Sequence, residues 1–194
     1  RLYVEKTDSA TRRAAQTVIY RILEALTLLI SPILAFTSDE IWRSMKHTSK
    51  VNPDRAVYND MPVVSEISCD EGFMETWDKI HALRDNVQKA LEEARNAKVI
   101  GASLEAKVTL FAKGDTFEFL SGVKDKLADV FIVSAVELKN EGEGAFKGSF
   151  EGVSVTVEKA GGHKCERCWK YTEDIGSDPN HPDICARCAK VVSE

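Results

Sequence analysis

The sequence predicts a multidomain α+β protein with three parts: an N-terminal antiparallel helical bundle (1–98), a small α+β unit (99–160) and a C-terminal four-cysteine module (161–194). Three observations lead to this prediction. Apolar residues recur at three- and four-residue spacing through most of the first part, as in helices that bury one face. After Gly101 they alternate with polar residues, as in half-buried strands. Four of the five cysteines form two Cys-x-x-Cys pairs near the C-terminus.

Three helical segments make up the first part. Cap candidates at 7–9 precede the first helix, and Pro32 ends or kinks it because proline lacks an amide hydrogen. Residues 37–40 read Thr-Ser-Asp-Glu, which predicts a capping box at the start of a second helix. The stretch 47–70 lacks periodicity and predicts a loop, and a long amphipathic helix follows over 73–94. Three consecutive helices favour a bundle, and two aromatic residues on apolar stripes are expected in its core: Trp42 and Trp77.

The α+β unit is predicted from shorter patterns. Residues 104–110 alternate apolar and polar side chains and predict a strand. A short helix is expected over 115–127, with Asp115 as its cap, and 130–138 is rich in strand-forming residues. A turn over 141–144 leads to a further alternating stretch, 146–157.

Composition limits the class of protein. The net charge is −5, but residues 1–50 hold 8 basic against 5 acidic side chains, 51–158 hold 12 against 20, and 159–194 hold 6 of each. A nucleic-acid partner would therefore have to use local basic clusters. We find neither a signal peptide nor a membrane-spanning run of roughly 20 apolar residues. The helix and strand patterns suffice for a core, so the cysteines do not indicate a disulfide scaffold and a reducing cytoplasm is expected. The chain starts at Arg1 and not at methionine, which indicates a fragment of a longer protein.

The cysteine spacing predicts a metal site. The pattern Cys-x2-Cys-x16-Cys-x2-Cys brings two sulfurs from each pair onto one ion, and four thiolates leave no open position for catalysis. A structural zinc ion is favoured over an iron–sulfur centre or a redox pair. Gly161-Gly162 is expected to act as a hinge before the site, His163 and His181 to be loop residues, and Cys69 to be an ordinary small side chain. The predicted zinc ligands are Cys165, Cys168, Cys185 and Cys188.

Aromatic and basic residues surround these cysteines. A ring among cations suits unstacked nucleic-acid bases, because the ring stacks on a base while the cations meet phosphate. The alternative is that the ring of Trp169 packs over the cysteines as a small core, and composition alone weights the two interpretations evenly. The cluster contains Trp169, Lys164, Arg167, Lys170 and Arg187.

Three passages resemble the C-terminal region of bacterial isoleucyl-tRNA synthetases, which are class I enzymes. Lys-Cys-Glu-Arg-Cys-Trp through Cys-Ala-Arg-Cys, within 164–188, is similar to their terminal zinc module. Ser-Pro-Ile-Leu-Ala-Phe-Thr-Ser-Asp-Glu-Ile-Trp (31–42) resembles a signature of the anticodon-binding helical domain, with Ala35 and Asp39 as departures. Lys-Val-Ile-Gly-Ala-Ser-Leu-Glu-Ala-Lys-Val (98–108) resembles a passage of the isoleucyl branch. Their order matches, and together they extend from residue 31 to residue 188 of the chain.

The resemblance implies an isoleucine–tRNA ligase that attaches isoleucine to its tRNA using ATP. This chain would recognise the anticodon, in contact with tRNA for isoleucine and with the remainder of the synthetase chain, as a monomer, in the cytoplasm and without a membrane. The class I signatures His-Ile-Gly-His and Lys-Met-Ser-Lys-Ser are absent from it. No catalytic residue is therefore assigned, and ATP with Mg²⁺ would bind only in a catalytic domain outside it. One structural Zn²⁺ is the expected cofactor here.

The resemblance also implies roles for single residues. Trp169 would stack on a base of the anticodon loop. The nearby cations would meet phosphates or base edges, and two arginines of the first helix would meet backbone phosphate. The predicted tRNA contacts are Trp169, Arg167, Lys164, Lys170, Arg187, Arg12 and Arg13.

Three other interpretations remain open at this point. A four-cysteine module of this spacing also ends a family of DNA-repair glycosylases, although here strands precede it. A valyl- or leucyl-type synthetase would explain the helical signature but not the terminal module. A zinc-stabilised protein-interaction domain without an RNA role would fit the acidic middle region.

Overall fold

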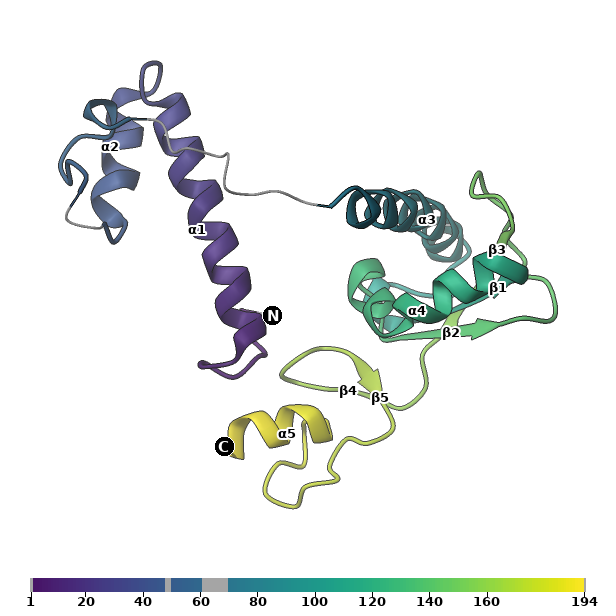
Figure 1. Ribbon diagram of the computed structural model, residues 1–194. Coiled ribbons are helices and arrows are strands. Elements are labelled where there is room, and N and C mark those ends of the chain that lie inside the picture. The colour runs from purple at the N-terminus through teal and green to yellow at the C-terminus, as the bar shows by residue number, and fades with distance from the viewer. Residues whose placement is uncertain (1, 48–49, 61–69, 194) are drawn as a thin grey trace. The chain divides into compact units, whose positions relative to one another are not determined.

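The computed structural model describes residues 2–47, 50–60 and 70–193. The chain forms two compact units, Arg1–Ser68 and Cys69–Glu194 (Figure 1). This division differs from the predicted boundary near residue 98, because the third helix packs its apolar face on the sheet of the second unit. The prediction for Cys69 concerns a position outside the described residues.

The described residues of the first unit form two helices, α1 (Ala10–Ile30) and α2 (Ala35–Ser44), and a 3-10 turn, η1 (Ala56–Tyr58). The Ser9 side chain caps α1 by accepting a hydrogen bond from Arg12 N at 3.2 Å, and α1 ends before Pro32, as predicted. Only two α1 residues are buried, and a stripe of apolar side chains is about half exposed: Val18, Ile19, Ile22, Leu26 and Leu29. An apolar stripe of this length on a helix is typical of an interaction surface.

The predicted capping box at 37–40 does not form. These residues lie inside α2, which starts at Ala35 without a side-chain cap. Asp39 is buried and holds the following loop instead: one carboxylate oxygen accepts from Ala56 N at 2.8 Å and the other from Arg55 Nη1 at 2.9 Å. The Ala56 N–H is the main reason why the pKa of Asp39 lies below its ordinary value. The stabilisation that this gives is present above the unfolded-state pKa and is lost as pH falls through the folded one.

The two predicted core tryptophans have different surroundings. Trp42 is fully buried with Leu28 and Ala56, and its Nε1 donates to Asn52 O at 2.7 Å. The prediction for Trp42 is confirmed. Trp77 lies on α3 (Glu71–Asn96) and is half-buried. Its ring is beside that of Phe73, with 6.1 Å between ring centroids, and it is outside the core cluster.

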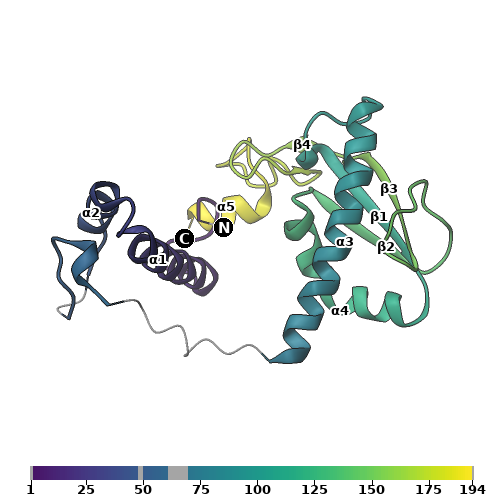
Figure 2. The same ribbon diagram turned by 90° about the horizontal axis from the view of Figure 1, so that it is seen from above.

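The second unit is built on a three-stranded sheet in the order β2-β1-β3 (Figure 2). Strand β1 (Ala106–Ala112) pairs in parallel with β2 (Ala135–Lys139) and antiparallel with β3 (Val153–Lys159). Helix α3 (Glu71–Asn96) precedes the sheet, and α4 (Gly114–Phe131) connects β1 to β2. A short 3-10 turn, η3 (Ser103–Glu105), leads into β1.

The core of this unit lies between the sheet and the two helices. It contains the buried faces of α3 and α4 together with alternate residues of β1 and β3, so the predicted alternation is confirmed there. Two strand predictions need correction. The β-rich stretch 130–138 begins inside α4, which continues to Phe131 before Ile132 turns the chain with φ 60°. The stretch 146–157 forms a strand only from Val153, while Phe146 makes one isolated bridge to Val155.

The C-terminal module follows β3. It consists of a short hairpin, β4 (His163–Lys164) and β5 (Tyr171–Thr172), and helix α5 (Ala186–Ser193). In the predicted hinge, Gly162 has φ 78°, and a Cβ there would lie 2.2 Å from Thr172 O, so the hairpin requires glycine. Among the described residues, no helix is both long and apolar enough to cross a membrane.

Candidate metal centre and nucleic-acid surface

The four predicted cysteines converge at one point. The sulfurs of Cys165, Cys168, Cys185 and Cys188 all lie within 4.8 Å of one another, and Cys168 Sγ and Cys185 Sγ are 3.9 Å apart. A tetrahedral zinc ion with Zn–S bonds of about 2.3 Å requires neighbouring sulfurs about 3.8 Å apart. The arrangement therefore fits a structural zinc ion.

Local structure supplies these ligands in pairs. The first pair lies in the turn that joins β4 to β5, and the second pair flanks the start of α5. Three of the cysteines are buried, and they form the module's own small core with Ile175 and Ile184 packed around it. Because so few apolar residues take part, the metal ion has to supply most of the folding free energy.

The thiols have unequal environments. Burial favours the neutral thiol of Cys165, but backbone N–H groups of Cys168, Cys185 and Arg167 outweigh this effect and lower its pKa to about 6. One of them, Cys185 N, lies 3.4 Å from Cys165 Sγ. Burial dominates at Cys185 and raises its pKa to about 12. Zinc binding to this site therefore releases protons, since the ligands are thiolates.

Neither neighbouring histidine joins the cluster. In the described residues, the group that can hold a metal ion consists of the four cysteines. His163 lies exposed on β4, and His181 N donates to Asp178 O in a turn at 2.9 Å. The prediction of a loop residue is confirmed for His181 and wrong for His163, which lies on a strand.

The backbone turn around the first cysteine pair holds Trp169 in an unusual conformation. Cys165 N donates to Lys170 O at 2.9 Å and Trp169 N donates to Cys165 O at 2.8 Å. These two bonds close the turn, and Trp169 lies at its left-handed position with φ 63°. A left-handed backbone favours glycine, and for other residues it costs about 1–2 kcal/mol.

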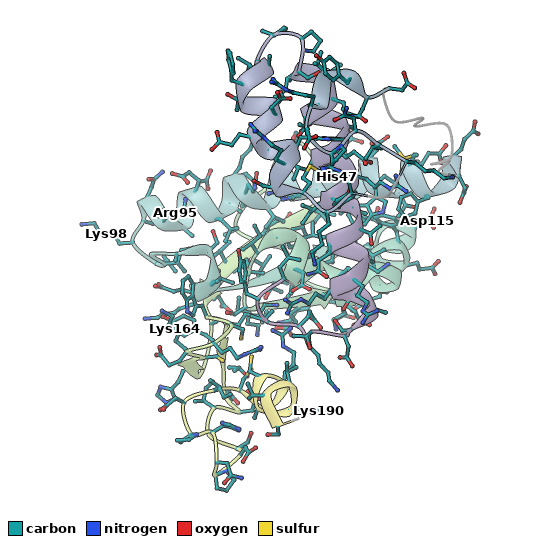
Figure 3. The ribbon with its side chains drawn as sticks, turned by 90° about the vertical axis from the view of Figure 1, so that its left-hand side faces the viewer. His47, Arg95, Lys98, Asp115, Lys164 and Lys190 are labelled. Carbon is teal, nitrogen blue, oxygen red and sulfur yellow. The ribbon has the colours of Figure 1, made fainter. Side chains whose placement is uncertain are left out.

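The Trp169 ring does not pack over the cysteines. It is 59% exposed, and Lys164 Nζ lies 5.2 Å from the ring centroid. Lys164 is on β4 and Lys190 is on α5, so both add positive charge to the surface of the module (Figure 3). The small-core interpretation of Trp169 requires a buried ring, so the exposed ring fits the interpretation as a nucleic-acid contact better.

The other predicted cations of the module have protein partners. Lys170 Nζ pairs with Asp129 Oδ1 at 2.8 Å. Arg167 Nη1 lies 3.8 Å from Cys188 Sγ. Arg187 interacts with the thiols of Cys168 and Cys188, which raise its pKa although burial acts in the opposite direction.

The two predicted arginines of α1 also differ. Arg12 is half-buried, and its Nη1 donates to Glu5 O at 3.3 Å, which turns its guanidinium back onto the N-terminal segment. Arg13 is exposed on the neighbouring position of the helix.

Within the second unit, we call the part formed by α3, α4 and strands β1 to β3 the sheet unit. Sequence reasoning missed the residues that attach the C-terminal module to it. Ser134 Oγ accepts from Tyr171 N at 2.7 Å and donates to Leu104 O, and Asp129 holds Lys170. These partners are 37 and 41 residues apart in sequence, so no local pattern reveals them.

Comparison with known proteins agrees with these observations. Residues 162–191 match the family model described as the zinc finger found in FPG and IleRS. Isoleucine–tRNA ligases of Carboxydothermus hydrogenoformans and Thermoanaerobacter sp. (strain X514) are 46% and 43% identical to the chain. Both alignments cover 100% of this chain. The same enzyme of Geobacter sulfurreducens is 43% identical over 98% of the chain. The chain spans about a fifth of the length of these relatives.

The helical part decides between the families that share such a zinc finger. The match to the anticodon-binding domain of tRNA ligase extends over residues 1–110, which is more than half of the chain. A glycosylase tail does not account for this match. The chain therefore belongs to the family of anticodon-binding domains of tRNA ligases.

Proposed function

We propose that this chain is the C-terminal part of an isoleucine–tRNA ligase and that it recognises the anticodon region of the tRNA for isoleucine. The family match and the isoleucine–tRNA ligases that resemble it over its whole length support this proposal. The complete enzyme would attach isoleucine to tRNA in the cytoplasm. ATP and Mg²⁺ would bind in its catalytic domain, because the chain lacks the class I nucleotide-binding signatures.

The backbone of Trp169 is the observation that carries the proposal. A residue that serves only the zinc turn would be glycine, because φ at this position is 63°. The chain instead has a large aromatic side chain there, with 59% of it exposed. Strain of this kind at an exposed aromatic residue supports a binding role, and stacking of a base on the ring is worth about 1–3 kcal/mol.

The other parts of the chain have separate proposed roles in binding tRNA and the rest of the synthetase. Lys164 extends the Trp169 surface with a cation that would meet phosphate, and Arg13 would meet the phosphate backbone from α1. The half-exposed apolar stripe of α1 is the surface at which we expect another segment of the synthetase to pack, since such stripes are rarely left open. We retain 1–98 as the segment that docks the anticodon stem, with 99–160 and 161–194 closing on the anticodon loop.

The test is a titration of the zinc-loaded chain with tRNA for isoleucine and with a non-cognate tRNA, over a series of salt concentrations. Trp169→Gly removes the ring and relieves the backbone strain together. We expect the stability of the module to change by less than about 1 kcal/mol, because strain relief offsets the lost ring contacts. Affinity for the cognate tRNA should fall by about 10-fold or more through the loss of stacking.

Trp77→Ala is the matched control, because it removes another partly exposed tryptophan far from the metal site in sequence. It should leave the ratio of the affinities for the cognate and non-cognate tRNA nearly unchanged, because the segment 1–98 is proposed to dock the anticodon stem and not to read the anticodon loop. Equal binding of both tRNAs, unaffected by Trp169→Gly, would contradict the proposal. The module would then be a structural element, and specificity would reside elsewhere in the enzyme.

A further inference from the structure

The two cysteine pairs share a feature beyond their spacing. Each reads Cys-x-Arg-Cys: Arg167 precedes the second cysteine of the first pair, and Arg187 precedes the second cysteine of the second pair. The module thus places one arginine at the same position in each half of the metal site.

Both arginines lie at the cysteine cluster. Arg167 Nη1 lies 3.8 Å from Cys188 Sγ, so this arginine crosses from its own pair to the opposite one. Arg187 lines a hollow together with Cys168 and Cys185. The thiols of Cys168 and Cys188 raise the pKa of Arg187, although burial acts in the opposite direction, so its charge interacts with these sulfurs as well.

Charge explains why such a pair is useful. Four thiolates around one divalent zinc ion leave two net negative charges at the centre. Three of the four cysteines are buried, so water screens this charge only in part. Two guanidinium groups supply two positive charges, and each can donate N–H hydrogen bonds to sulfur.

We propose that Arg167 and Arg187 are positioning residues for the zinc ion: they neutralise the four-thiolate centre and thereby hold the metal. They then serve the metal site first, and the cations that remain for tRNA on this module are Lys164 and Lys190. Neutralisation also removes the repulsion that a doubly negative centre would exert on a nearby phosphate. The retention of zinc does not depend on whether the module binds tRNA.

The experiment measures the zinc dissociation constant of the whole chain by competition with a chromophoric chelator, without tRNA. Residues that support metal ligands in this way typically change affinity by about 10–100-fold. We expect Arg167→Ala to weaken zinc binding by about 10-fold or more. Arg187→Ala should weaken it less, because Arg187 is more exposed than Arg167. Lysine at either position should restore part of the loss, since it keeps the charge but not the planar fork.

Lys190→Ala is the matched control, because it removes one positive charge from the same module. It should leave the zinc dissociation constant within about twofold of the parent, in contrast to the change expected from losing a supporting residue. Cobalt substitution provides a second readout. The thiolate-to-cobalt charge-transfer band reports that four sulfurs still bind in the variants, and loss of a guanidinium from sulfur should shift it.

Three results would overturn the proposal. Alanine variants that bind zinc as tightly as the parent would show that the guanidinium groups do not hold the metal. If those variants instead lowered the salt dependence of tRNA binding by about one counterion each, the arginines would be phosphate contacts. If Lys190→Ala weakened zinc binding equally, the effect would arise from the overall charge of the module and not from the two arginines.

Discussion

The sheet unit and the C-terminal module lie next to each other in sequence but are stabilised in different ways. The sheet unit buries sixteen apolar residues in one core that joins α3, α4 and the strands. The module has a small cluster made chiefly of its own metal ligands. One compact unit of this chain therefore contains a part that folds on apolar burial and a part whose fold depends on an ion.

Removal of zinc should give the largest difference in stability between the two parts. A chelator, or Cys188→Ser, removes a metal-binding free energy of about 10 kcal/mol or more from the module and leaves the apolar core intact. We expect the amides of 163–193 to lose their protection against hydrogen exchange while those of β1 and α4 keep theirs. Hydrogen exchange followed by mass spectrometry measures both at once.

Cys69→Ser is the control for that experiment, because it replaces the one cysteine outside the two pairs. It should leave the exchange pattern unchanged. If zinc removal exposed the amides of β1 to the same extent as those of α5, the sheet would depend on the metal as well, and the contrast between the two parts would fail.

The attachment between the parts is the next place to test. Ser134 Oγ bridges Tyr171 N of the module and Leu104 O before the sheet. Ser134→Ala leaves both backbone groups without this partner and should cost about 1–3 kcal/mol. We expect the melting temperature of the zinc-loaded chain to fall and the zinc-free chain to be much less affected, because the module is unfolded there. Differential scanning calorimetry with and without zinc measures the difference.

Ser121→Ala provides the comparison, since Ser121 Oγ donates only to Phe117 O within its own helix. Its effect should be small and the same with and without zinc. An equal effect of Ser134→Ala in both states would mean that the serine supports the sheet alone and does not join the two parts.

The sequence predicted the module better than it predicted the packing of the helices. Cysteine spacing identifies the four ligands because a tetrahedral site demands two close pairs and a return loop. The apolar stripe of α3 was correctly recognised, but a stripe fits a sheet as well as a helical bundle, so its partner could not be predicted. The Thr-Ser-Asp-Glu pattern of 37–40 was misleading for a similar reason, because a buried Asp39 that holds Ala56 N is indistinguishable in sequence from an N-cap.

Other features of the site lay beyond local pattern. The residue types around the cysteines predicted a basic and aromatic surface, but not which cations turn inward. Arg167 is directed at Cys188, which is 21 residues away in sequence, and Lys170 at Asp129. Because these partners are distant in sequence, residue types alone predict both side chains as tRNA contacts. The left-handed backbone of Trp169 follows from the turn that two hydrogen bonds close, and no propensity for tryptophan would indicate it.

The smallest effect is expected at the ion pair between the two parts. Lys170 and Asp129 are partly exposed, with 26% and 48% of their side chains accessible, so solvent and salt screen their attraction. A double-mutant cycle with Lys170→Gln and Asp129→Asn should give a coupling of about 0.2–1 kcal/mol, which declines at high salt. Chemical denaturation of the zinc-loaded chain measures it. A coupling that persists in about 1 M salt would mean that this pair, and not the Ser134 bridge alone, fixes the module on the sheet unit.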